Sequence, residues 1–148
     1  MALKKDGTVV AWGAHGKYVD FGQADVPANL TDVVAISAGY AHSLALKKDG
    51  TVVAWGDNEY GQTDVPVNLR NVISISARGN HNLALKNDGT VVAWGRNDFG
   101  QCNVPRNLTD VKAISSGNGF SYVLKNDGTI VAWGVDHFGQ IDIPTGIQ

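Results

Sequence analysis

The chain has 148 residues, of which 43% are hydrophobic and 18% are charged, and its formal net charge at pH 7 is −2. This composition supplies apolar material for a core and argues against disorder. Because the charge is nearly balanced and no apolar stretch is long enough to span a bilayer, we expect neither nucleic acid nor a membrane as a partner. The chain shows no signal peptide, so a cytoplasmic location is the default expectation.

One phrase, "LKKDGTVVAWG" at residues 3–13, returns almost unchanged at residues 46–56, 85–95 and 124–134. A Gly-Gln pair follows each copy, and the proline four residues after each Gln recurs every 39 residues, at Pro27, Pro66, Pro105 and Pro144. A third phrase, "VVAISAGYAHSLAL" and its variants, precedes only the last three copies. The chain is therefore a tandem array, and each unit is one structural repeat.

Within one unit the pattern is typical of β-structure. "DVVAISAG" and "HSLALKKDG" place apolar residues at alternate positions or in short runs, and the Asp-Gly pairs at residues 49–50, 88–89 and 127–128 are hairpin signals. "TVVAWG" predicts the return strand, and the stretch through "GQTDVP" predicts a loop and a short outer strand that the proline closes. Each unit is thus expected to form four short antiparallel strands.

Units of four strands at this period predict an all-β fold built from β-propeller blades. We expect a single repeat domain over residues 1–148, with blade units at about 1–32, 33–71, 72–110 and 111–148. Three blades would be complete, and the first would lack its innermost strand. Four blades could in principle close into a ring, whereas blades shaped for a larger ring would leave an open arc or half ring.

The residues that every unit repeats are expected to be architectural. The four tryptophans would supply packing mass, and leucines would make the contacts between blades, at Leu46, Leu85 and Leu124. The alternative reading of the tryptophans is a stacking platform for bases or sugars.

The string "SAGYAHSLALKKDGTVVAWGDNEYGQTDVP" resembles the repeat of the regulator of chromosome condensation family, in the compact bacterial form whose propeller also occurs in a secreted β-lactamase inhibitor. The resemblance spans nearly the whole chain. It implies a ring of about seven blades and a face that holds another protein. It does not fix the task, because one fold hosts unrelated functions.

Function is expected where the copies differ, first in the turn between the first and second strands of each blade. In the inhibitor-type propellers this loop series contacts the target, so the resemblance implies a protein-binding surface made of Tyr40, His42, Arg78, Asn80, His81, Asn118 and Phe120. For His42 and His81 the alternative is a structural role, as hydrogen-bond partners of the backbone within their own blades.

The loops after each Trp-Gly also vary and form a second candidate contact face. The aromatic residue that recurs in them is expected to pack within the blades, at Phe21, Tyr60, Phe99 and Phe138. The first of these loops is longer, and residues 15–19 are expected to be a tolerated surface insertion or, alternatively, a binding finger.

No combination of residues indicates catalysis, a metal or a cofactor. The four histidines share no motif, and metalloprotease, nucleophile-elbow and nucleotide-binding patterns are missing. The single cysteine, Cys102, cannot form an internal disulfide. We therefore expect a protein that is not an enzyme.

The sequence predicts a protein-binding propeller, adaptor-like or inhibitor-like, whose partner it does not name. Because an open arc exposes apolar blade faces and an unpaired strand edge, we also expect self-association, most simply as a twofold dimer of arcs. One alternative is a purely structural segment of a longer propeller with no partner of its own. A third hypothesis is an exchange factor for a small GTPase.

Overall fold

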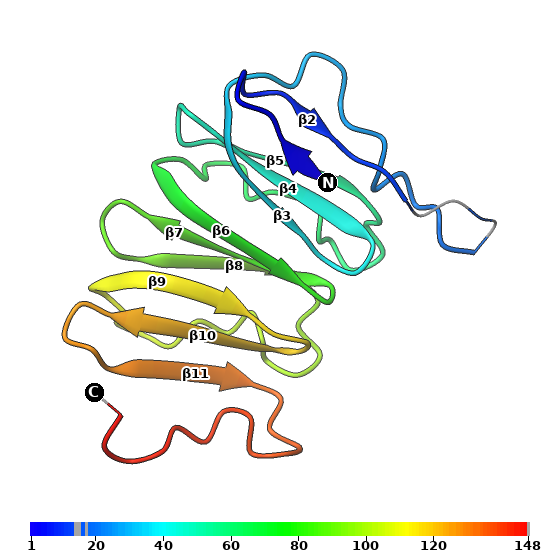
Figure 1. Ribbon diagram of the computed structural model, residues 1–148. Coiled ribbons are helices and arrows are strands. Elements are labelled where there is room, and N and C mark those ends of the chain that lie inside the picture. The colour runs from blue at the N-terminus through cyan, green and yellow to red at the C-terminus, as the bar shows by residue number, and fades with distance from the viewer. Residues whose placement is uncertain (14–15, 17, 148) are drawn as a thin grey trace.

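Antiparallel sheets follow one another along the computed structural model, which describes residues 1–13, 16 and 18–147 (Figure 1). The first is a hairpin of β1 (Ala2–Leu3) and β2 (Val9–Val10). The three-stranded sheets after it are β3 (Val33–Ala38), β4 (His42–Lys47) and β5 (Val52–Gly56); β6 (Val72–Arg78), β7 (His81–Lys86) and β8 (Val91–Gly95); and β9 (Val111–Ser116), β10 (Phe120–Lys125) and β11 (Ile130–Gly134). The expected all-β fold of blades is confirmed. In the described part of the chain, no helix could cross a membrane.

The Asp-Gly turns join the second and third strands of each blade, as predicted. Asp49 Oδ1 accepts hydrogen bonds from the Thr51 N–H, at 3.0 Å, and from the Thr51 hydroxyl, at 2.6 Å. Gly50 has a φ of +82°, a conformation that favours glycine, and a Cβ there would lie 3.1 Å from the Asn71 nitrogen. The same Asp–Thr contacts recur in the other blades, at Asp6, Asp88 and Asp127.

The outer fourth strand does not form in the described chain, and each complete blade has three hydrogen-bonded strands. Between β5 and β6 the backbone turns on itself instead: the Asp64 N–H donates to the Gly61 carbonyl at 3.1 Å, and the Leu69 N–H donates to the Pro66 carbonyl at 3.0 Å. These bonds are local, and proline has no N–H to offer. The segment therefore follows the edge of β5 as a loop.

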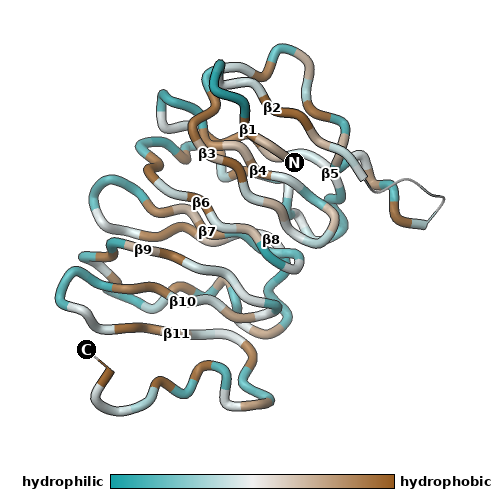
Figure 2. Tube along the Cα trace, in the orientation of Figure 1, coloured by the Kyte–Doolittle hydropathy of each residue, from teal (hydrophilic) through white to brown (hydrophobic). Residues whose placement is uncertain are grey.

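The hydrophobic core lies between the blades. Leu44, Leu46 and Val52 of the second blade share one buried cluster with Val72 and Trp94 of the third. The next interface repeats this arrangement with Leu83, Leu85, Val91, Val111 and Trp133. Figure 2 shows the corresponding pattern along the chain, with hydrophobic stretches in the strands and hydrophilic ones in the turns.

Three of the four tryptophans also hydrogen-bond the preceding blade. Their indole N–H donates to the backbone carbonyl of the repeated glutamine, in the pairs Trp55–Gln23 at 3.0 Å, Trp94–Gln62 at 3.2 Å and Trp133–Gln101 at 2.9 Å. These side chains are 7–8% exposed, whereas Trp12 of the first blade is 66% exposed. The architectural role is confirmed for the three buried tryptophans. Trp12 differs because no blade of the described structure covers it.

The blades stack side by side as an open arc, from β1 and β2 at one end to β9–β11 at the other, with the two termini at opposite ends (Figure 1). Bonds between the innermost strands hold neighbouring blades in register. Ser37 Oγ accepts from the Ala77 N–H at 2.9 Å, and Ser76 Oγ accepts from the Ser116 N–H at 3.0 Å. These bonds fix the second blade against the third and the third against the fourth.

Candidate protein-contact face

Both variable loop series lie at the same end of the blades. The first residue after each Trp-Gly donates its N–H to the turn between the first and second strands, in the pairs Asp57–Ala41, Arg96–Asn80 and Val135–Gly119, each at 2.9 Å. We call this end the rim and define it as residues 18–21, 39–42, 57–60, 78–81, 96–99, 117–120 and 135–138. It lies on the right in Figure 1, opposite the Asp-Gly turns. The two candidate faces of the sequence are therefore one surface.

Three of the predicted contact residues line one depression in the rim. Tyr40, Arg78 and Asn118 come from three successive blades and border a hollow of about 500 Å³ together with Ala38, Gly39, Ala77 and Gly79. All three are exposed, Tyr40 at 81%. The Tyr40 N–H donates to the Gly79 carbonyl at 2.8 Å, which joins two of the turns. The hollow thus presents an aromatic ring, a guanidinium and an amide to solvent.

His42 and His81 lie inside the blades, 1% and 0% exposed, and do not reach the rim surface. His42 Nε2 lies 2.7 Å from Asn82 Oδ1, and His81 Nε2 lies 3.0 Å from Ser121 Oγ, so each histidine binds a side chain of the following blade. The sequence suggested a backbone partner within the same blade, and the structure shows side-chain contacts that join each histidine to the following blade. Since an amide oxygen only accepts, His42 Nε2 carries the proton in that pair.

Burial keeps both imidazoles neutral. It lowers the pKa of His42, and it lowers the pKa of His81 to about 4, with a smaller effect from the nearby His42 ring. The Nδ1 atoms of both rings are buried and have no hydrogen-bond partner among the described residues. Both histidines are therefore buried structural residues that lie beneath the rim.

Asn80 and Phe120 are half-buried. Asn80 Oδ1 is buried without a partner among the described residues. The Phe120 ring meets the Tyr122 ring edge to face, with centroids 5.3 Å apart. Gly117 lies directly against Phe120, where a Cβ would collide with the ring. Only part of these two side chains is available to a partner.

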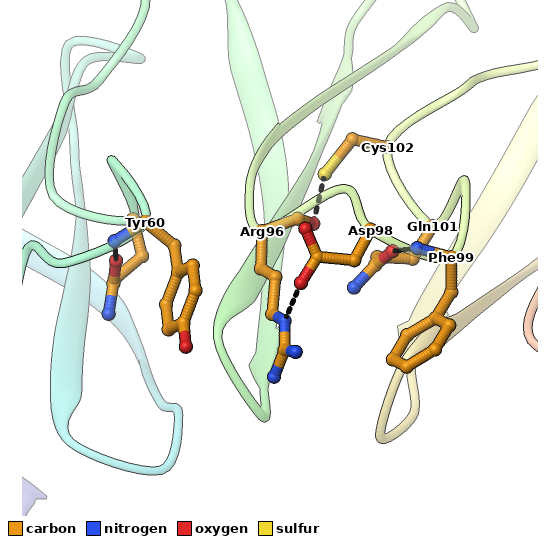
Figure 3. A network of polar contacts seen from close by, with 7 residues as sticks. Tyr60, Arg96, Asp98, Phe99, Gln101 and Cys102 are labelled. Carbon is orange, nitrogen blue, oxygen red and sulfur yellow. Dashed lines mark hydrogen bonds and ion pairs between the residues drawn. The ribbon is translucent and has the colours of Figure 1, made fainter.

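Arg96 is a rim residue that the sequence analysis did not select. Its guanidinium carbon lies 4.8 Å from the centre of the Tyr60 ring in the preceding blade and 5.5 Å from the centre of the Phe99 ring in its own blade (Figure 3). Its Nε donates to Asp98 Oδ2 at 2.6 Å. Such stacking of a cation on aromatic faces is favourable. The sequence feature that could have identified it is the position of Arg96, three residues before the recurrent aromatic Phe99.

The recurrent aromatics are rim residues, and the expectation that they pack within the blades was wrong for three of them, whereas Tyr60 is half-buried. Phe21, Phe99 and Phe138 are 48%, 46% and 93% exposed. Their backbone is held by the glutamine two residues later, which accepts the N–H, as Gln101 Oε1 does from Phe99 at 2.9 Å (Figure 3). The Phe99 ring also contacts Arg96 and meets the His137 ring edge to face. The rings therefore stand beside the gaps between blades. Of the longer first loop, residues 14, 15 and 17 lie outside the described residues, so the insertion or binding finger expected at 15–19 stays a prediction.

The described residues hold no group of three or more His, Cys, Asp or Glu side chains arranged for a metal ion. Cys102 is half-buried, its thiol donates to the Arg96 carbonyl at 3.2 Å, and burial raises its pKa to about 11. A thiol in this state is a poor nucleophile at neutral pH.

An arc of antiparallel blades, packed through tryptophans and open at both ends, defines part of a β-propeller. A sequence model of the regulator of chromosome condensation (RCC1) repeat matches residues 33–62, 72–101 and 111–140, which is more than half of the chain. The chain belongs to the RCC1 repeat family. Among curated protein sequences no match is found.

Solved structures agree with this assignment. Prp20p from Saccharomyces cerevisiae is 28% identical with a TM-score of 0.65, and the match covers 76% of this chain and 33% of that one. Human WBSCR16 is 23% identical with a TM-score of 0.63, over 77% and 40% of the two chains. The ectodomain of the Arabidopsis thaliana receptor kinase ACR4 is 23% identical with a TM-score of 0.62, over 78% and 40%. The chain thus spans about a third to two fifths of the length of these structures.

Proposed function

We propose that this chain is a non-enzymatic protein-binding module, adaptor-like or inhibitor-like, whose rim is the contact surface. The observation that carries the proposal is the hollow lined by Tyr40, Arg78 and Asn118. Tyrosine and arginine are the residue types that most often dominate binding energy at protein interfaces. Asn80 and Phe120 border the same surface, and His42 and His81 hold its turns in place.

The family gives this proposal its context. The structure of Prp20p was described together with the binding of that protein to Gsp1p and histones, and a second structure has Kap60 bound to yeast RCC1 (Prp20), which is 25% identical to this chain. Both statements concern those proteins. By analogy we expect a protein as the partner here as well, whereas an exchange-factor role has no separate support in the rim.

Capture of a partner from a lysate of the source cells tests the proposal. Because Tyr40 and Arg78 are exposed, Tyr40→Ala and Arg78→Ala should leave the blades intact. If these residues are hot spots, each substitution should weaken the binding of a captured partner by about 2 kcal/mol. Val67→Ala, at a residue 97% exposed outside the rim, is the matched control. A partner that binds both rim variants as tightly as the parent chain would refute this surface.

We also propose that copies of the chain associate through their end blades. At one end of the arc Trp12 is exposed. At the other end an apolar groove of about 250 Å³ is lined by Tyr122, Leu124 and Ile130. In the inner blades the residues at these three positions are buried against the tryptophan of the next blade. A twofold dimer of arcs would bring these faces together at two seams. In multi-angle light scattering at micromolar concentration, a species of twice 15.7 kDa would support this, and a monomer would contradict it. A monomer without any captured protein would favour the alternative, a structural segment of a longer propeller.

A further inference from the structure

The gaps between neighbouring blades at the rim are built alike but filled differently. Each gap is bordered by the recurrent aromatic of the preceding blade and by the first residue after Trp-Gly of the following blade. These first residues are Asp57, Arg96 and Val135, and the three identical backbone bonds described above place them equivalently.

The gap between the second and third blades is filled by a cation of the chain itself. The Arg96 guanidinium stands between the Tyr60 and Phe99 rings and pairs with Asp98 (Figure 3). In the following gap the filling is apolar, because Val135 occupies the position, and a Cβ on Gly119 would lie 3.0 Å from its Cγ1. The geometry of a gap therefore accepts either a guanidinium or an aliphatic group.

The gap between the first and second blades is open. A pocket of about 470 Å³ is lined there by Tyr18, Val19, Phe21, Gln23, Tyr40 and Ala41. Phe21 is the equivalent of Tyr60, the ring on which Arg96 stacks. The residue equivalent to Arg96 is Asp57, whose shorter side chain carries the opposite charge. Asp57 does not line the pocket itself but adjoins it, because its N–H donates to the carbonyl of the lining residue Ala41 at 2.9 Å.

The Asp57 carboxylate is held in place by its own blade. Its Oδ2 accepts a hydrogen bond from Gln62 Nε2 at 2.9 Å, and its Oδ1 accepts from the Glu59 N–H at 3.2 Å. A carboxylate has lone pairs beyond these two bonds and can still pair with a guanidinium. Aromatic faces and a fixed carboxylate together form the environment that a desolvated cation prefers.

We propose that this pocket receives an arginine side chain of a partner protein, stacked on Phe21 and Tyr40 and paired with Asp57. The inference rests on the proposed protein-binding function and adds the chemistry of the residue that is recognised. Arginine fits better than lysine because the planar guanidinium stacks on rings and pairs with a carboxylate at the same time, as Arg96 does in the next gap.

The test uses a minimal probe, N-acetyl-arginine methylamide, with its neutral isostere N-acetyl-citrulline methylamide as the control. Titration followed by heteronuclear NMR should give saturable shifts at Phe21, Tyr40 and Asp57 with the arginine probe, and none with citrulline. Asp57→Asn and Phe21→Leu should each weaken binding by at least about threefold. Equal binding of both probes, or unchanged affinity of Asp57→Asn, would overturn the inference.

Arg96→Ala tests independently whether a gap between blades prefers a cation. Removing this cation should create a second site, with new shifts at Tyr60 and Phe99 on addition of the arginine probe. Arg96→Gln serves the same purpose if the alanine variant is poorly folded. If neither variant gains a site, the gap has no preference for a cation and the inference fails.

The outcome is separable from the fate of the proposed function. If the arginine probe does not bind but Tyr40→Ala and Arg78→Ala still abolish partner capture, the rim is the contact surface and only the arginine pocket is wrong. If the probe binds but no rim variant affects capture, the pocket exists and the partner uses another surface, which refutes the proposed role of the rim.

Discussion

Trp94 offers a direct measure of how much one contact between blades contributes to stability. Its side chain is 7% exposed and packs in the cluster that joins Leu44, Leu46 and Val52 to Val72. Replacing a buried tryptophan by alanine costs roughly 3–5 kcal/mol, because the transfer free energy is lost and a cavity remains. The lost hydrogen bond to the Gln62 carbonyl adds about 1 kcal/mol, and that carbonyl keeps a second donor, Asn82 Nδ2 at 2.7 Å. We therefore expect Trp94→Ala to fall at the upper end of that range.

Trp12→Ala is the matched control, because it is the same substitution at the equivalent position of a blade. Trp12 is 66% exposed, so its removal should change the free energy of unfolding by no more than about 0.5 kcal/mol in the monomer. Urea unfolding followed by circular dichroism measures both variants. A loss of about 4 kcal/mol would remove much of the roughly 5–15 kcal/mol that folded domains typically have. Equal effects of the two substitutions would show that the packing of Trp94 between blades does not contribute to the free energy of unfolding.

Three further predictions concern single residues. The pKa of His81 is about 4 in the folded chain against 6.5 for the free side chain, so the unfolded chain binds more protons between these values. Stability should therefore fall as the pH is lowered from 6.5 towards 4, by up to about 3 kcal/mol, and His81→Gln should flatten this profile. Gly50→Ala should destabilise the chain by more than Gly13→Ala, because both glycines have a positive φ but only Gly50 lies close to the backbone of another segment. Equal losses of stability in chemical denaturation would show that this close backbone approach does not matter. Cys102, with a pKa of about 11 against 9.0, should react with a disulfide reagent at pH 8 roughly 100-fold more slowly in the folded chain than in guanidinium, and equal rates would contradict its burial.

Much of the fold could be predicted from the sequence because each blade repeats the same local signals. The Asp-Gly turns and the three strands around them depend on residues within one period, and they appear where they were expected. The outer strand could not be predicted reliably, because "GQTDVP" has the composition of both a loop and an edge strand. The segment forms a loop because its turns use backbone N–H and C=O groups that pairing with a neighbouring strand would need.

The candidate site was predictable only in part. Tyr40, Arg78 and Asn118 were found because they vary among aligned turns, and the structure brings them together. His42 and His81 looked like surface residues from their place near a turn, but their rings point into the blade toward Asn82 and Ser121, which are 40 residues away in the sequence. Arg96 was missed because its partner Tyr60 belongs to the preceding blade. Contacts between repeats cannot be read from one repeat alone.

The hydrogen bonds between blades recur at fixed separations, which are about one repeat for His42 with Asn82 and Ser76 with Ser116, and 20 residues for Asn82 with the Gln62 carbonyl. A gene duplication that copies one whole unit therefore copies a donor for one neighbour and an acceptor for the other. The inserted blade would meet complementary partners on both sides, and no buried polar group would be stranded. Insertion of half a unit would break this correspondence at two places. The number of blades can consequently change during evolution in whole steps, while each rim loop remains free to diverge.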